Sequence, residues 1–100
     1  MDIEQMRQAA TETAAVLRSL SHPDRLMLLC QLSQGELSVG ELEEMLGIQQ
    51  PNLSQQLGVL RAERLVDTRR EGKRIFYSVK DPKVLHLLST LYLLYCPQPQ

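Results

Sequence analysis

Two cysteines are the side chains of this 100-residue sequence best suited to covalent chemistry. Cys30 ends the leucine-rich run RLMLLC, and Cys96 stands between a tyrosine and a proline near the C-terminus. Thiols in proteins are either inert core groups or groups that react once they ionise. On composition alone, one core thiol and one incidental exposed thiol is the simpler interpretation, and a redox-active pair is the alternative.

A second set of polar side chains has the chemistry of DNA-base recognition, because amides can pair bidentately with the edges of bases. In a helix that starts near Pro51, Asn52 and Gln55 would point away from the apolar residues of that helix, which are Leu53, Leu57 and Leu60. These two amides are therefore expected on an outward face.

A third set is basic and surrounds a turn. Residues 1–60 carry three arginines against eight acids, whereas residues 61–100 carry eight lysines or arginines against four acids, so the net charge of -1 hides a basic C-terminal part. Arg70, Lys73 and Arg74 flank Gly72, where they are placed to contact phosphates. An ordinary solvated turn is the alternative.

Neither an enzyme nor a membrane protein is indicated. The sequence has no CxxC motif and no nucleophile with a base at a recognisable spacing, and His22 belongs to a helix start. It has no apolar run of 18 or more residues and no signal-peptide pattern at its N-terminus. We therefore expect a cytoplasmic protein with no membrane partner.

Two short helices joined by a tight turn should position the amides. Ser38 followed by Glu41 is a capping box, Gly47 can end the first helix in a left-handed conformation, and Pro51 suits the first turn of the second. This helix-turn-helix should span about residues 38–64. The positions expected to be buried are apolar: Leu42, Met45, Leu46, Ile48, Leu53, Leu57 and Leu60.

The flanking segments complete a single domain over residues 1–100. Apolar residues recur every three or four positions over 3–20, and Ser21 with Asp24 predicts the cap of a helix that ends near Gly35.

A period of two over residues 65–79 predicts a β-hairpin, or wing. The helix predicted at 82–96 is apolar on nearly every side, which a small monomer could not bury. The helices at 3–20 and 82–96 are therefore expected to form a homodimer interface.

The motifs SLSHPDRLMLL, GELSVGELEEMLGIQQPNLSQQLGVLRAERLV and TRREGKRIFYSV together resemble the ArsR/SmtB type of repressor. The resemblance implies a mainly α winged helix-turn-helix homodimer with a β-hairpin wing. It also implies double-stranded DNA as partner, with an imperfect inverted repeat as operator. By position in the motifs, it implies DNA contacts from Gln49, Gln50, Asn52, Ser54 and Gln55, beside the wing residues Arg70, Lys73 and Arg74.

Metal-responsive members of that family carry cysteines at positions that Ser38 and Gly40 occupy here. Others use aspartate and histidine in the last helix, where His86 lacks a second imidazole and a suitably spaced aspartate. The comparison therefore implies no metal and no cofactor.

The settings RLMLLC and LYC resemble instead the sulfide- and persulfide-responsive branch of the family. This implies that Cys30 and Cys96 form a dithiol that a reactive sulfur species or oxidant bridges, after which the repressor releases its operator. A metal-responsive repressor of the same family is the alternative, as is a winged-helix anti-repressor or protein-interaction module.

Overall fold

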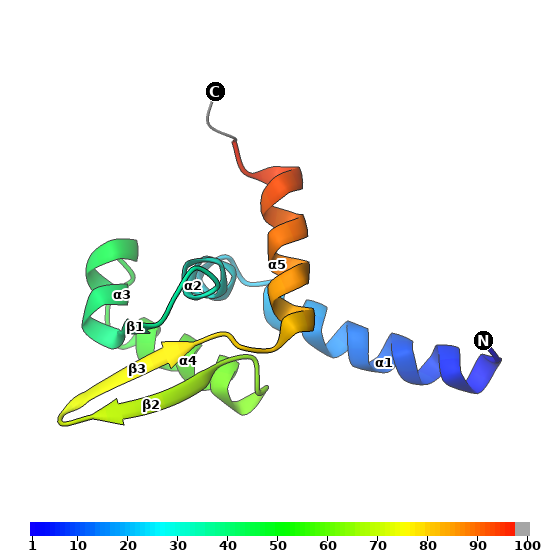
Figure 1. Ribbon diagram of the computed structural model, residues 1–100, viewed down its shortest axis with the longest axis horizontal. Helices are drawn as coiled ribbons and strands as arrows, with labels where there is room; N and C mark the ends of the chain where they lie inside the picture. Colours follow the sequence, from blue (N-terminus) through cyan, green and yellow to red (C-terminus); the bar gives the residue numbers. More distant parts are fainter. Residues whose placement is uncertain (98–100) are drawn as a thin grey trace.

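Within residues 1–97, which the computed structural model describes, five helices form close to their predicted places (Figure 1). Their bounds are α1 (Ile3–Leu20), α2 (Pro23–Leu32), α3 (Val39–Leu46), α4 (Asn52–Ala62) and α5 (Pro82–Tyr95). The predicted continuation of α4 to residue 64 was too long, because Arg64 has the left-handed φ of 60° and the chain turns there. The sequence also predicts that Pro97 and Pro99 stop the last helix just after Cys96 and leave a disordered tail; Pro99 lies outside the described residues.

The helix ends follow local capping chemistry. The capping box of α3 is confirmed: Ser38 Oγ accepts from the Glu41 amide at 3.2 Å, and Glu41 Oε1 accepts from the Ser38 amide at 3.0 Å. Gly47 ends α3 with a φ of 68°. The predicted Ser21 cap of α2 was wrong, because His22 Nδ1 takes that position and accepts from the Asp24 amide at 3.1 Å.

The predicted wing forms an antiparallel hairpin of β2 (Asp67–Glu71) and β3 (Arg74–Ser78). A third strand, β1 (Leu37–Ser38), pairs with β3 in the order β1-β3-β2, with Leu37 opposite Tyr77. The sequence did not predict β1, since two residues, the second of which is the helix cap Ser38, are too few to show strand periodicity. This strand joins the wing to the start of α3.

The core lies where α2, α3 and α4 meet the sheet and the first turns of α5. Fully buried leucines fill it, namely Leu28, Leu29, Leu32, Leu42, Leu53, Leu57, Leu60 and Leu88. The prediction that Met45 is buried was wrong, because its side chain is 54% exposed. Helix α3 packs on α2 and the sheet through the side that carries Leu42, and Met45 lies on the neighbouring solvent side.

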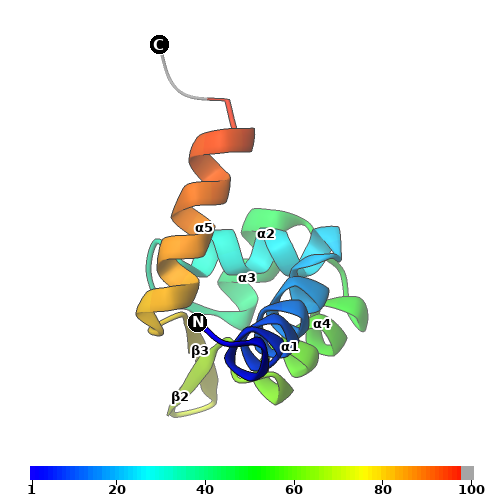
Figure 2. The same cartoon turned by 90° about the vertical axis from the view of Figure 1, so that its right-hand side faces the viewer.

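Two helices extend away from this core in different directions (Figures 1 and 2). The large exposed apolar side chains on α1 are Ile3, Met6 and Leu17, and those on α5 include Leu93, Leu94 and Tyr95. The single chain therefore leaves the apolar faces predicted for dimerisation uncovered. None of the described helices is long and apolar enough to cross a membrane.

Candidate DNA interface and thiol pair

The start of α4 presents an exposed polar surface. Gln49, Ser54 and Gln55 are exposed, and within residues 1–97 the side chains of Gln49 and Gln55 form no hydrogen bond. Gln50 instead caps the helix, since its Oε1 accepts from the Ser54 amide at 3.0 Å. Gln55 thus offers both ends of its amide to a base, whereas the carbonyl end of Gln50 holds the helix start.

Asn52 does not point outward as expected. Its side chain is half-buried against α2, where Nδ2 donates to Asp24 Oδ2 at 2.8 Å. Its Oδ1 accepts from Gln56 Nε2, also at 2.8 Å. The expected orientation was wrong, because spacing within α4 cannot show that the first turn of α2 packs against this side.

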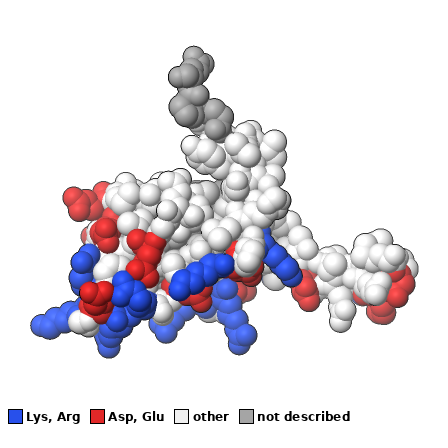
Figure 3. Space-filling view, viewed as in Figure 1, with Lys and Arg blue, Asp and Glu red and all other residues white. Residues whose placement is uncertain are grey.

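The basic side chains of the wing fall into two groups, those without a bond to the rest of the domain and those held against it. Arg70 and Lys73 are exposed and make no hydrogen bond or ion pair with the residues that the structure describes. Lysine and arginine gather along the wing edge with acidic side chains among them, whereas the upper part of α5 shows no charged side chain in this view (Figure 3). These two cations can meet phosphates without first breaking an internal bond.

Arg69 and Arg74 are instead held against the domain. Arg69 Nη2 lies 2.7 Å from Glu36 Oε1, and the hydrogen bonds from Arg69 lower the pKa of Glu36. Arg74 Nη2 donates to Ser38 Oγ at 3.1 Å and lies 3.5 Å from a carboxylate oxygen of Glu41. Both guanidinium groups also lie over the ring of Phe76, at 4.6 Å and 4.9 Å from its centroid.

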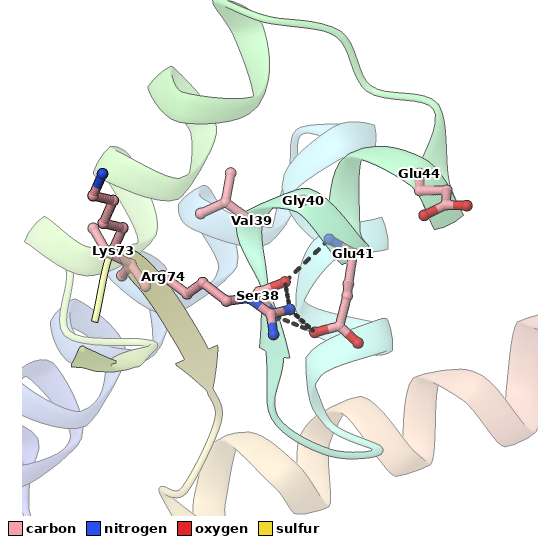
Figure 4. A pocket seen from close by; sticks show the side chains of 8 residues that line it. Ser38, Val39, Gly40, Glu41, Glu44, Lys73 and Arg74 are labelled. Carbon is pink, nitrogen blue, oxygen red and sulfur yellow. Dashed lines mark hydrogen bonds and ion pairs between the residues drawn. The ribbon is translucent and has the colours of Figure 1, made fainter. Parts of the chain in front are cut away.

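A cavity of about 600 Å³ opens between α3 and the wing (Figure 4). Arg74 crosses from the wing to Ser38 and Glu41, while Lys73 and Glu44 stand apart at the sides of the opening. Ser38 and Gly40, the positions compared above with metal-binding cysteines, line this cavity. No group of three or more histidine, cysteine, aspartate or glutamate residues in the described chain could hold a metal ion.

The two thiols lie on helices that pack together. Cys30 is half-buried on α2, and Cys96 is exposed directly after α5. Burial raises the pKa of Cys30, and the charge of Cys96 raises it further, so the two groups are within electrostatic reach. A cavity of about 360 Å³ beside Cys30 is lined by residues of α2 and α5 and by Ser33 and Gln34.

Sequence reasoning assigned no role to Arg25 or to Gln56. Arg25 Nη1 donates to Gln56 Oε1 at 3.1 Å, which joins the first turn of α2 to α4 beside Asn52. One sequence feature points to Gln56: it stands four residues after Asn52 and so shares its helix face.

Known proteins match this chain over most of its length. The profile described as "Bacterial regulatory protein, arsR family" matches residues 22–68. The biofilm growth-associated repressor of Agrobacterium fabrum is 57% identical over 91% of this chain and 78% of that protein. The transcriptional activator HlyU of Vibrio cholerae is 36% identical over 100% of this chain and 93% of that protein.

Solved structures share the whole arrangement. The crystal structure of the transcriptional repressor BigR from Xylella fastidiosa has a TM-score of 0.88 and 53% identity, covering 98% of this chain and 100% of that one. Reduced HlyU from Vibrio cholerae has a TM-score of 0.89 and 36% identity, covering 95% and 100%. The predicted winged helix-turn-helix is therefore confirmed, and so is the expectation that the chain is not an enzyme.

Proposed function

This chain belongs to the arsR family of bacterial regulatory proteins, and from that premise we propose that it is a homodimeric repressor with a thiol switch. Membership of the family makes it a DNA-binding regulator of transcription. In the proposed cycle, the reduced dimer blocks transcription at an imperfect inverted repeat, and bridging of Cys30 to Cys96 releases it.

Helix α4 is proposed to enter the major groove, where the exposed Gln55 reads a base edge. Gln49 and Ser54 lie beside it on the exposed surface, and Gln50 holds the helix start. Arg70 and Lys73 then contact phosphates through the wing, and Arg74 sets the position of the wing through Ser38.

The dimer is proposed to form through α1 and α5. Burying their exposed apolar side chains against a second copy would stabilise the dimer, because each fully buried aliphatic side chain contributes roughly 1.5–3 kcal/mol. A two-fold axis between the copies would set the separation of the two α4 helices. Such symmetric readers recognise half-sites about one helical turn of DNA apart.

One observation carries the proposed switch: α2, which holds Cys30, packs on α5, which Cys96 directly follows. In keeping with this packing, the charge of Cys96 adds to burial in raising the pKa of Cys30. Because α2 also packs on α4, a bond between the two thiols would tie the reading helix to the dimer helix α5. The separation of the two readers would then change, and operator affinity would fall.

The proposed bridge forms in two steps with a hydropersulfide, RSSH, as oxidant. The first thiolate attacks the terminal sulfur, which gives a protein persulfide and releases RSH after protonation. The second thiolate attacks the protein-bound sulfur of that persulfide, so that a disulfide forms and hydrogen sulfide leaves. In total, two thiols are oxidised by two electrons and one RSSH is reduced to RSH and hydrogen sulfide. A further RSSH adds each extra sulfur in a longer bridge.

The test combines mass spectrometry with operator binding by the reduced and the persulfide-treated protein. We expect a Cys30–Cys96 crosslink, with or without extra sulfurs, together with loss of binding to the promoter of its own gene. The variants Cys30→Ser and Cys96→Ser should bind that promoter when reduced and remain bound after treatment. Unmodified thiols, or full release from both variants, would rule out the switch.

An activating output is the second candidate, because the relative HlyU is named as a transcriptional activator. In that case the reduced protein would displace another DNA-binding protein and raise transcription. A promoter-reporter assay with and without the chain separates the two outputs by the sign of the change.

A further inference from the structure

Four polar side chains form a continuous row between the first turn of α2 and the start of α4. An aspartate and an arginine of α2 stand at its two ends, and two amides of α4 stand between them. Asp24 accepts from Asn52 at 2.8 Å, Asn52 accepts from Gln56 at 2.8 Å, and Gln56 accepts from Arg25 at 3.1 Å. All four side chains are half-buried.

The charges at the two ends determine which way both amides face. A carboxylate can only accept and a guanidinium can only donate, so Asn52 must turn its NH2 group to Asp24, and Gln56 must turn its carbonyl to Arg25. The remaining carbonyl of Asn52 then faces the remaining NH2 of Gln56, which is the pairing observed. Rotating either amide by half a turn would break both of its hydrogen bonds in the row and would place donors against donors and acceptors against acceptors. The row therefore has one stable arrangement.

The same arginine reaches a third helix. Arg25 Nε donates to the carbonyl of Ser19 at 2.7 Å, and its Nη2 donates to that of Arg18 at 3.3 Å. These carbonyls belong to the last turn of α1, where a cation is favoured by the partial negative charge of the helix end. Arg25 thus connects the end of α1 with α4.

We infer that Asn52 and Gln56 are positioning residues, which set the orientation of α4 against α2 and α1, and that Asn52 does not read a base. The inference rests on the proposed operator binding by α4. Both hydrogen-bonding ends of the Asn52 amide already have partners within the domain, whereas those of Gln55 have none among the described residues. A base contact through the N–H and the lone pair that already serve Asp24 and Gln56 would require breaking both bonds, one of them to a charged group.

An exchange of the two partners tests this inference. Asn52→Asp alone places a carboxylate beside Asp24, so we expect operator affinity to fall about tenfold or more and the unfolding temperature to drop. The double variant Asp24→Asn with Asn52→Asp restores a donor at 24 and an acceptor at 52 and keeps the native net charge. It should recover operator affinity to within about threefold of the original protein, with the same preference at every base pair.

Base readout predicts the opposite result, because an aspartate at 52 cannot donate to a base, whatever stands at 24. A double variant that regains its unfolding temperature but still lacks operator affinity would overturn the inference. Affinity is compared at a temperature where every variant is folded, and Gln55→Ala serves as the matched control, with changed base preference and native stability. If the original protein bound no operator, the proposed function would fail. The unfolding temperature of the double variant would still decide whether the row of four side chains holds α4 in place.

Discussion

Burial raises the pKa of Cys30 and the charge of Cys96 raises it further, although the two residues lie far apart in the sequence. Partial burial is the larger cause, and a Cys96 thiolate adds to it because a second negative charge nearby is unfavourable. Cys30 is consequently less ionised at neutral pH than an ordinary thiol. The exposed Cys96 is therefore expected to react first with a persulfide.

The alkylation rate of Cys30 should accordingly rise with pH over a higher range than that of an unperturbed cysteine. In Cys96→Ser the same curve should move to lower pH, because serine carries no charge. Mass spectrometry of iodoacetamide-treated protein measures both curves, and identical curves would contradict the coupling.

A raised pKa means that the folded state prefers the protonated thiol of Cys30. Its contribution to folding stability is therefore present below the pKa of the thiol in the unfolded chain and is lost as pH rises through the pKa in the folded state.

Replacing Arg70 or Lys73 by alanine should weaken binding to all duplexes by a similar factor. Each lost phosphate contact should reduce the slope of log affinity against log salt by about 0.9. Titrations at several salt concentrations measure this slope. Arg74→Ala should also lower the unfolding temperature, because it removes the contact with Ser38. For the Arg70 and Lys73 variants, a slope of log affinity against log salt equal to that of the original protein would show that the wing does not touch DNA.

Replacing Gln55 by alanine should reduce discrimination at one base pair of each half-site. The expected cost is about 1–3 kcal/mol at that position, and binding to other duplexes should change little. A set of operators with single base-pair changes measures the effect. Equal losses on every duplex would assign Gln55 to the backbone of DNA rather than to its bases.

Replacing Leu94 by glutamate should weaken dimer formation, because the side chain is 70% exposed on the apolar face of α5. Burying a leucine contributes roughly 1.5–3 kcal/mol, and a buried unpaired carboxylate adds a further penalty. Sedimentation velocity reports the oligomeric state. Met45→Glu is the control, since Met45 is also an exposed apolar residue but lies on α3. Equal behaviour of the two variants would place the dimer interface elsewhere.

Replacing Ser38 by alanine should destabilise the fold by about 1 kcal/mol through loss of the α3 cap. It should also release Arg74 from one of its partners. Urea unfolding measures the change, and Ser38→Thr, which keeps the hydroxyl, should remain near the original stability. An alanine variant as stable as the threonine variant would show that the cap contributes little.

The sequence alone was sufficient for most features governed by neighbours along the chain, although it placed the cap of α2 at Ser21 instead of His22 and ended α4 too late. Capping residues, a left-handed glycine and apolar spacing placed the helices and the hairpin within a few residues of their observed bounds. These features depend on hydrogen bonds and side-chain directions within one element. They also supported the winged helix-turn-helix that the solved relatives confirm.

Only the tertiary structure decided which side chains from separate elements meet. The pairing of Leu37 with Tyr77, the turn of Asn52 toward Asp24 and the approach of Cys96 to Cys30 all join residues at least 28 positions apart. Spacing within a helix gives the direction of a side chain but not the element packed against it. An outward position in α4 thus became a contact with α2, and Cys96 came within electrostatic reach of Cys30.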